Sequence, residues 1–238
     1  MDRGQKDALF ARAVKNRTPL TTETQRHGEK RALVAVGKLL PRSFFNRDPR
    51  VVARELLGKL VVRRESGEVL SGRIVETEAY LGADDLAAHA AAGQTARNAV
   101  LFGPAGHVYV YFIYGMYYCL NFSCLPDGEA GGVLIRALEP VAGLVAMARA
   151  RGLKSFNAES LRDRRALTSG PGRLCDALGI TRARDNAKDA TSTRSDLQVR
   201  DDGFHAGRVL ATPRIGIVKS AELPLRYIVA GSKFLSRN

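Results

Sequence analysis

Tryptophan is absent from this sequence, and cysteine is scarce. The three cysteines, Cys119, Cys124 and Cys175, lack the paired spacing of a zinc site, and an odd number cannot all form disulfides within one chain. Small proteins that depend on disulfides carry more cysteines, usually in even number. We therefore expect no disulfide framework, no bound metal and a reducing compartment.

Long apolar runs are also absent. No stretch approaches the ~18 apolar residues that a membrane-spanning helix needs. The first residues, MDRGQKDALFARAVKNRTP, lack the apolar segment of a signal peptide. These absences argue against a membrane protein and against a secreted one, so we expect a cytoplasmic protein.

The composition is otherwise globular, with a strong basic surplus. The chain has 238 residues and a mass of 25.8 kDa, and it is 45% hydrophobic, which suffices for one domain with a sizeable core. Lys and Arg number 37 against 24 Asp and Glu, which gives a net charge of +13. Such a surplus favours a polyanionic partner such as nucleic acid or an acidic membrane surface.

The basic charge is distributed unevenly along the chain. Residues 1–40, 41–70 and 141–238 carry net charges of +5, +3 and +9, whereas residues 71–140 carry −4 and contain no lysine. Basic segments on both sides of a slightly acidic centre are consistent with phosphate contacts that flank a separate binding or reaction site.

Local patterns predict an α+β domain over residues 39–238, preceded by a mobile basic tail over residues 1–38. Asp48 followed by Pro49 predicts a helix N-terminus, and Gly58 predicts the end of that helix near Leu57. The strands follow one another in hairpins, which predicts a curved, largely antiparallel sheet with flanking helices. The other predicted elements are helices at 140–151 and 169–178, a mobile polar loop at 181–203, and strands at 59–64, 68–81, 107–113, 117–124, 132–138, 214–218 and 225–229.

Six of the seven tyrosines lie between Tyr80 and Tyr118, close to a pair of carboxylates. In the predicted strand RIVETEAY, the two-residue period places Glu76, Glu78 and Tyr80 on one face. A carboxylate beside an aromatic ring is suited to activating water next to a stacked planar ligand. The predicted hairpin tip at Tyr114-Gly115 would expose a rigid ring, as a side chain that enters a base stack requires.

Each of these features has an ordinary structural alternative. Clustered tyrosines are common in half-buried sheets, Glu78 could be a surface carboxylate, and His89 could be a structural histidine. Two other function classes also stay open. A non-catalytic nucleic-acid binder would use the same basic flanks and tyrosines but gives Glu78 no role. An amidohydrolase or formyl-transfer enzyme acting on a small molecule fits the sheet but not the charge of +13.

Four longer segments narrow these alternatives, because they recur in the same order in one family. The segments GRIVETEAYLG, TARNAVLFGPAGHVYVYFIYGMYYCLN, VLIRALEP and SGPGRLCDALGI strongly resemble the alkyladenine (methylpurine, 3-methyladenine) DNA glycosylase family. The resemblance runs with gaps from about Leu40 to Arg237. It implies a bacterial-type, cofactor-free monomer that flips alkylated or deaminated purines out of double-stranded DNA and hydrolyses the N-glycosidic bond. Lyase chemistry needs an amine nucleophile, and residues 71–140 contain no lysine, so we expect a monofunctional enzyme that leaves an abasic site.

The resemblance also implies roles for the residues of the catalytic centre. Glu78 of ETEAY matches the general base that activates water, and Arg136 of LIRALEP matches the arginine that helps to hold that water. The segment RIGI resembles a strand whose backbone, here the Ile215 carbonyl, supports the same water. Glu76 lies outside the family's catalytic position, so we expect it to matter less than Glu78.

For base recognition, the resemblance implies a pocket and a wedge. Tyr80 and Tyr111 match the rings that sandwich the flipped base, His89 matches a histidine that stacks on the base and hydrogen-bonds near the glycosidic linkage, and Asn121 matches the residue that crowds the 2-amino group of guanine. Three residues match contacts with the DNA outside the pocket: Tyr114, which fills the space that the base leaves, and the flanking Met116 and Tyr117. The sequence departs from the family at Ala96, where proline is usual, and in HAAAG after the histidine.

Overall fold

The structure is a computed structural model that describes residues 37–237. Most of the predicted N-terminal tail therefore lies outside the described residues. Its last residue, Lys38, belongs to the two-residue strand β1 (Lys38–Leu39), which pairs with β7 (Leu197–Asp201) through Lys38 and Asp201. The described part of the chain thus begins at one end of the sheet.

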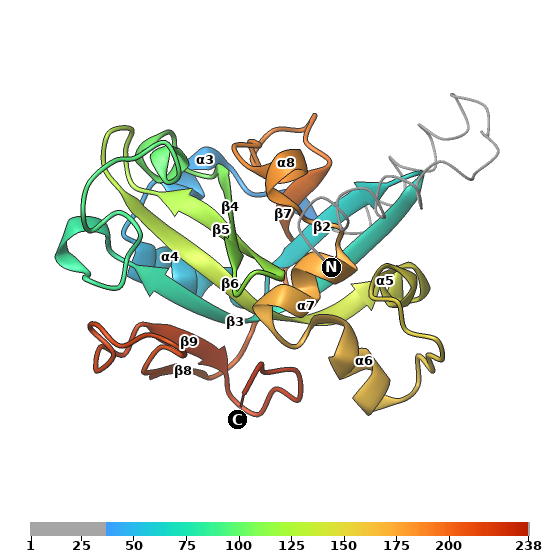
Figure 1. Cartoon of the computed structure of the whole chain (residues 1–238). Coiled ribbons are helices and arrows are strands. Elements are labelled where there is room, and N and C mark those ends of the chain that lie inside the picture. The colour runs from blue at the N-terminus through green and yellow to red at the C-terminus, as the bar shows by residue number, and fades with distance from the viewer. Residues whose placement is uncertain (1–36, 238) are drawn as a thin grey trace.

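One nine-stranded sheet organises the fold, and all eight of its strand pairings are antiparallel. The main path runs β1-β7-β2-β3-β6-β5-β4, and β8 joins through β9, which pairs with β3 (Figure 1). This sheet confirms the predicted α+β class. The other strands are β2 (Leu60–Glu65), β3 (Glu68–Tyr80), β4 (Val108–Ile113), β5 (Tyr117–Cys124), β6 (Gly131–Ala142), β8 (Val209–Thr212) and β9 (Arg226–Val229).

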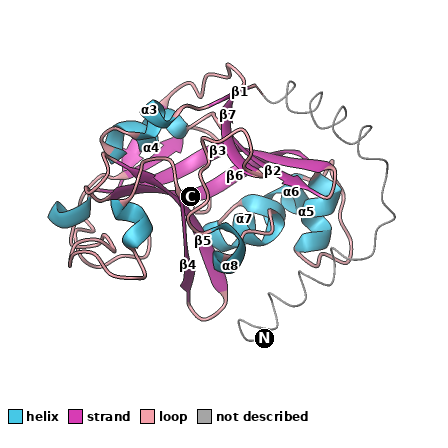
Figure 2. Ribbon diagram, turned by 90° about the horizontal axis from the view of Figure 1, so that it is seen from above, coloured by secondary structure: helices cyan, strands magenta, loops and turns pink. Residues whose placement is uncertain are grey.

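Short helices cover both sides of the sheet. Figure 2 shows α3 and α4 on one side and α5 to α8 on the other. Between them lies a core of aliphatic and aromatic side chains from both sides of the sheet. In the described part of the chain, no helix has the length and apolar character needed to cross a membrane. The helices are α3 (Arg42–Phe45), α4 (Pro49–Leu56), α5 (Leu144–Ala150), α6 (Leu161–Thr168), α7 (Pro171–Ala177) and α8 (Arg182–Asp185).

Helix α4 forms as its sequence predicts. The Asp48 carboxylate accepts a hydrogen bond from the backbone N–H of Arg50, and Pro49 occupies the first helical turn. Gly58 follows the helix with φ of 88°, a conformation that glycine adopts without steric cost. The helix buries Val52 and Leu56 against the sheet and so fixes one side of strand β3.

The hairpin between β4 and β5 ends at the predicted tip. Tyr114 and Gly115 both have positive φ (54° and 65°), and the Met116 N–H donates to the Ile113 carbonyl at 3.2 Å. Two left-handed central residues make a tight turn that suits the twist of a hairpin. Tyr114 is strained there, because a tyrosine rarely adopts this conformation. The hairpin protrudes from the body of the molecule (Figure 2).

Two neighbouring bulges shape the centre of the sheet. Along β3 and β6, Ile74 pairs with Leu138 and Glu76 with Ala137, so Val75 is an extra residue on β3. The next pair is Thr77 with Ile135, which leaves Arg136 as an extra residue on β6. Bulges redirect side chains locally. They occur here beside both carboxylates of the ETEAY segment.

Several sequence predictions for the C-terminal half were wrong. Residues 181–203 are not a mobile loop: they contain α8 and β7, and strand β7 is paired on both edges. Their charged residues suggested a loop, but Asp185 and Asp196 form ion pairs with the fully buried Arg63. Residues 140–142 extend β6 rather than beginning a helix, residues 214–218 are irregular while 209–212 form β8, and helix α6 was not predicted.

Candidate functional site

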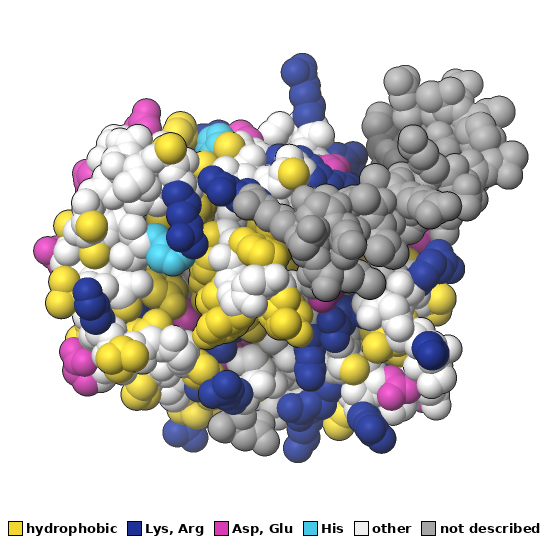
Figure 3. Space-filling model, in the orientation of Figure 1, with side chains coloured by type: hydrophobic (Ala, Val, Ile, Leu, Met, Phe, Trp, Pro, Cys, Tyr) yellow, Lys and Arg dark blue, Asp and Glu magenta, His cyan; other side chains and the backbone are white. Residues whose placement is uncertain are grey.

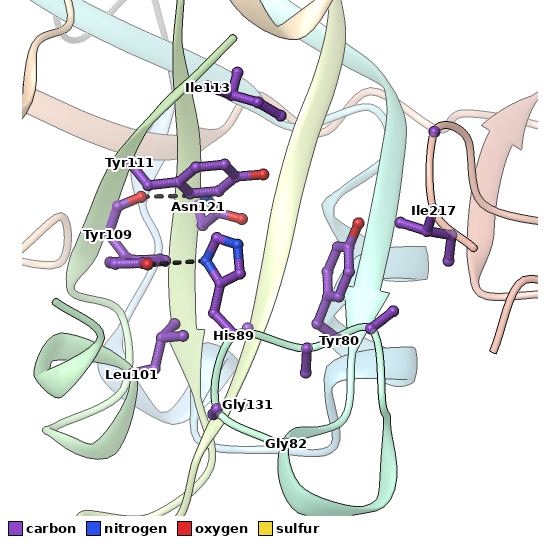
Figure 4. A pocket seen from close by; sticks show the side chains of 15 residues that line it. Tyr80, Gly82, His89, Leu101, Tyr109, Tyr111, Ile113, Asn121, Gly131 and Ile217 are labelled. Carbon is purple, nitrogen blue, oxygen red and sulfur yellow. Dashed lines mark hydrogen bonds between the residues drawn. The ribbon is translucent and has the colours of Figure 1, made fainter. Parts of the chain in front are cut away.

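A cavity of about 190 Å³ opens where the ends of β3 and β4, the 82–90 loop and the 216–217 loop meet. Typical sites for drug-sized ligands are larger, about 300–1,000 Å³, so the size favours a single planar ring system. Figure 4 shows the Tyr80 ring on one side of this cavity and the His89 and Tyr111 rings on the other. The lining residues are Tyr80, Gly82, Ala87, Ala88, His89, Ala90, Leu101, Tyr109, Tyr111, Ile113, Asn121, Gly131, Gly132, Gly216 and Ile217.

Glu78 lies next to this cavity and is fully buried. Its Oε1 accepts from the backbone N–H of Ile215 at 2.8 Å and lies 3.2 Å from Arg136 Nη1. Its Oε2 accepts from the Tyr80 hydroxyl at 3.0 Å. A carboxylate offers about four acceptor positions, so Oε2 keeps one for a further donor such as water. The Tyr80 hydroxyl connects the carboxylate to the cavity, because Glu78 itself is not among the lining residues.

Glu76 occupies a closed polar cluster on the other side of Arg136. Its Oε1 accepts from Arg136 Nε at 3.0 Å and from Arg226 Nε at 2.7 Å. The backbone N–H and hydroxyl of Ser236 complete its shell at 2.7 and 2.8 Å. Burial of this carboxylate is therefore balanced by two guanidinium groups and two neutral donors. The cluster therefore fixes the position of Arg136 on the side opposite Glu78.

The Tyr80 ring is supported by a buried ion pair. The Arg214 guanidinium lies 4.6 Å from the centre of the ring and bonds Asp85 through Nη2 and Oδ1 at 2.8 Å. Arg214 also donates to the Ala79 carbonyl, and Asp85 accepts from the N–H groups of Leu81 and Ala87. Burial and the Glu78 charge raise the pKa of Tyr80, so its hydroxyl stays protonated at neutral pH.

His89 is held against two tyrosines of β4. Its Nδ1 lies 2.9 Å from the Tyr109 hydroxyl, and its ring meets the Tyr111 ring edge-on with centres 4.4 Å apart. The buried Asn98 side chain donates to the backbone carbonyl of His89, which orders this Ala-rich loop. Burial, followed by the charge of Arg97, lowers the pKa of His89 and keeps the imidazole neutral.

Asn121 closes the end of the cavity from β5. Its side-chain N–H group donates to the backbone carbonyls of Tyr109 at 3.2 Å and of Cys119 at 3.4 Å. These bonds leave the amide oxygen on the side that faces the cavity (Figure 4). An acceptor fixed there would discriminate between ring substituents by their hydrogen-bonding character.

The hairpin tip lies outside the cavity. Tyr114 is 76% exposed and Met116 is 47% exposed, whereas the Tyr117 ring packs against Gly172 of α7, where a Cβ atom would come within 2.7 Å of it. Figure 3 shows hydrophobic side chains in the middle of this face, over the β4–β5 hairpin of Figure 1, with Lys and Arg side chains around them. Such a surface suits a partner with charged edges and a stacked interior.

The structure thus brings together six of the nine residues that the resemblance implied and places the other three, Tyr114, Met116 and Tyr117, at the tip. The backbone atom of Ile215 that contacts Glu78 is its N–H; the role implied for its carbonyl stays a prediction. Sequence reasoning missed Tyr109, although its two-residue spacing from Tyr111 places both on one strand face. It also missed Arg214, Asp85 and Ser236, for which no local pattern gave a signal.

Metal-binding geometry is absent from the described residues: no group of three or more His, Cys, Asp or Glu side chains converges there. The site instead combines an aromatic cavity, a buried carboxylate held by arginine, and a basic surface. These features define a class of α+β enzymes that bind a planar ring next to a carboxylate.

Comparisons with known proteins agree with this class. The family description of methylpurine-DNA glycosylase matches residues 43–233. A protein from Koribacter versatilis is 66% identical over 197 residues, covering 83% of this chain and 92% of its own. Relatives from Burkholderia cenocepacia and Methanoculleus marisnigri are 47% and 46% identical, covering 84% and 83% of this chain and 92% and 98% of their own. All three are named "Putative 3-methyladenine DNA glycosylase".

The chain belongs to the methylpurine-DNA glycosylase family, a family of base-repair hydrolases whose substrate is DNA. This membership confirms the resemblance on which the residue roles rest.

Proposed function

We propose that this protein is a monofunctional glycosylase that flips alkylated or deaminated purines of the 3-methyladenine type out of duplex DNA and hydrolyses their N-glycosidic bond. One observation carries the proposal: Glu78 adjoins an aromatic cavity through the Tyr80 hydroxyl and is held by Arg136 and by the Ile215 N–H.

The chemistry follows from this geometry. A water that donates to the free acceptor position of Glu78 Oε2 attacks the anomeric carbon of the sugar. The carbon–nitrogen bond breaks, its electron pair leaves with the base, and the water proton passes to Glu78. A purine alkylated at N3 or N7 is cationic and departs as a neutral base, so it needs little help from an acid. General-base assistance is typically worth about 10²–10⁴-fold.

Base binding relies on the rings around the cavity. A base inside a duplex is unreachable, and extruding it costs a few kcal/mol. Stacking between Tyr80 and the Tyr111–His89 pair offsets this cost by roughly 1–3 kcal/mol per base. A cationic base gains further attraction to the tyrosine faces. The exposed Tyr114 ring at the hairpin tip fills the space in the duplex.

The chain acts as a monomer and binds the phosphates of the DNA with its basic surface. The exposed Arg97 and Lys219 follow, along the chain, the 82–90 and 216–217 loops that border the cavity, and both suit phosphate contacts. None of the residues that line the cavity is a lysine, which supports hydrolysis without lyase chemistry.

The decisive experiment measures release of free base from a duplex with one 3-methyladenine or hypoxanthine. We expect the base to appear together with an alkali-labile abasic site, and we expect no borohydride-trapped covalent adduct with DNA. Binding without release would support the nucleic-acid binder instead. A trapped adduct that is lost in Lys219→Ala would show lyase chemistry from Lys219.

A further inference from the structure

Asp85 and Arg214 form a fully buried ion pair next to the cavity, and the mechanism above gives this pair no role. Neither side chain has any exposed surface, and neither residue lines the cavity. Burying two opposite charges removes the water around both, and their attraction roughly offsets that cost, so such a pair adds little stability compared with apolar side chains. What distinguishes this pair is therefore the set of groups that it holds in place.

Arg214 connects three segments that surround one side of the cavity. Its Nη1 donates to the Ala79 carbonyl of β3 at 3.0 Å, and its Nη2 donates to the Ser220 carbonyl, in the segment that follows Arg214, at 3.3 Å. The same Nη2 donates at 2.8 Å to Asp85, which belongs to the 82–90 loop. One guanidinium thus fixes a strand end and two loops relative to one another.

The two neutral donors of Glu78 belong to groups that Arg214 holds. The Ile215 N–H, which donates to Oε1 at 2.8 Å, is on the residue directly after Arg214. The Tyr80 hydroxyl, which donates to Oε2 at 3.0 Å, belongs to the ring whose centre lies 4.6 Å from the Arg214 guanidinium. Because Tyr80 lines the cavity and Arg214 does not, the guanidinium supports this ring from the side away from the cavity.

We infer that Arg214 and Asp85 are positioning residues for the general base, which hold the Ile215 N–H and the Tyr80 hydroxyl on the two oxygens of Glu78. The inference rests on the proposed function and deepens it. With both oxygens held, the carboxylate cannot rotate. The acceptor position left on Oε2 therefore keeps one direction relative to a base in the cavity, as an attack by an oriented water requires.

The first test needs no DNA and reads the Ile215 N–H in a ¹H–¹⁵N NMR spectrum. The chain has seven isoleucines, so selective ¹⁵N labelling of isoleucine gives few signals, and Ile215→Val identifies the Ile215 signal by its loss. Asp85→Asn keeps the shape of the side chain but removes its charge. We expect this variant to shift the Ile215 signal, although Asp85 is far from Ile215 in the sequence. An unchanged signal would overturn the inference.

Asp185→Asn is the matched control. Asp185 is also fully buried and pairs at 2.7 Å with a fully buried arginine, Arg63, and neither of these residues lines the cavity. Both variants should lose stability, because each leaves a buried arginine with less negative charge around it. The Ile215 signal should stay in place in Asp185→Asn. An equal shift in this control would contradict a specific role of the Asp85–Arg214 pair.

The second test measures single-turnover excision of hypoxanthine from duplex DNA at saturating enzyme, at a temperature where both variants are folded. Asp85→Asn should lower the rate roughly tenfold or more, the worth of one hydrogen bond to a charged group. The enzyme concentration that gives half of the maximal rate should change little. Asp185→Asn should excise at close to the wild-type rate. Equal losses in the two variants would make the effect one of stability and overturn the positioning role.

A double-mutant cycle with Tyr80→Phe connects the rate to the Tyr80 hydroxyl. Because Tyr80→Phe already removes one of the two neutral donors, Asp85→Asn should cost less in that background than in the wild type. The same loss in both backgrounds would contradict a role that acts through this hydroxyl. If the wild type excises nothing, the proposed function fails, while the NMR experiment still decides whether the pair positions the Ile215 N–H.

Discussion

Arg136 lies between two carboxylates of strand β3 that have opposite surroundings. On one side, Glu76 is enclosed by Arg136, Arg226 and Ser236, and the buried Phe234 and Leu235 pack nearby against Val75 and Ala137. On the other side, Glu78 has fewer donors and adjoins the aromatic cavity through Tyr80.

The difference shows that burial and an arginine partner do not by themselves make a carboxylate catalytic. Both carboxylates are fully buried and both bond the same guanidinium. Only Glu78 keeps an acceptor position beside a cavity, which is what activating a water requires. The Glu76 oxygens instead accept hydrogen bonds from Arg136, Arg226 and Ser236, and so hold Arg136 and the C-terminal residues in place. We therefore expect one carboxylate to serve the reaction and the other the stability of its surroundings.

The largest expected effect is that of Glu78→Gln. The amide preserves the shape of the side chain but is not a base, so single-turnover excision should fall by roughly 10²–10⁴-fold. Binding to lesion-containing duplex should persist, because stacking and phosphate contacts remain. The matched control is Glu139→Gln on β6. The Glu139 carboxylate is half-exposed and forms a loose ion pair with Arg164, at 3.7 Å. Near-normal excision by Glu78→Gln would contradict the assignment of Glu78 as the carboxylate that serves the reaction.

Glu76→Gln should show the opposite pattern. It leaves Arg136 and Arg226 sharing a neutral partner in a buried cluster, and breaking a buried ion pair typically costs about 3–5 kcal/mol. We expect the free energy of unfolding in urea to drop by about 3 kcal/mol. In Glu55→Gln, where the carboxylate is exposed and paired with Arg47, it should hardly change. Wild-type stability in Glu76→Gln would remove the structural role of the closed cluster.

A smaller loss of excision is expected from a change at the hairpin tip, which lies outside the cavity. Tyr114→Ala removes an exposed ring, so folding should be unaffected, while excision from duplex DNA should fall about tenfold because the vacated space goes unfilled. Release of the same base from single strands should change little. Phe204→Ala, at another exposed aromatic residue, provides the control. Equal losses on duplex and single-stranded DNA would place Tyr114 in the base pocket instead.

The smallest effect concerns charge far from both carboxylates. Affinity for DNA should fall linearly and steeply with salt on a double-logarithmic plot, because bound phosphates release counterions. Deleting residues 1–36, which carry eight basic and four acidic side chains, should make this slope shallower and leave single-turnover excision unchanged. A flat salt dependence of the full chain would contradict the phosphate contacts.

Local patterns predicted much of the sheet, and the family resemblance named most of the residues that are discussed at the cavity. The Asp48-Pro49 start of α4, the Tyr114-Gly115 tip and the shared face of Glu76, Glu78 and Tyr80 each depend on neighbours a few residues away, and the structure contains all three. Family membership, which rests on longer strings of residues, was also readable from the sequence.

The wrong prediction for residues 181–203 has one cause, which is pairing between distant segments. Residues 181–203 look like a loop because they are polar, yet Asp185 and Asp196 are ion-paired to Arg63 of β2. Charge patterns do not reveal whether a partner lies across the sheet. Strand β7 is ordered by pairing with β1 and β2, which precede it by more than a hundred residues.

The sequence by itself determined the family, the strand faces and the residue types at the site. Only the tertiary structure decided what surrounds each carboxylate. The donors that enclose Glu76 come from Arg226 and Ser236, which are 150 and 160 residues away, and Tyr80 rests on an Arg214–Asp85 pair whose members are 129 residues apart. The free energy of a buried charge depends on all the groups that replace its water, and those groups become neighbours only when the whole sheet has formed.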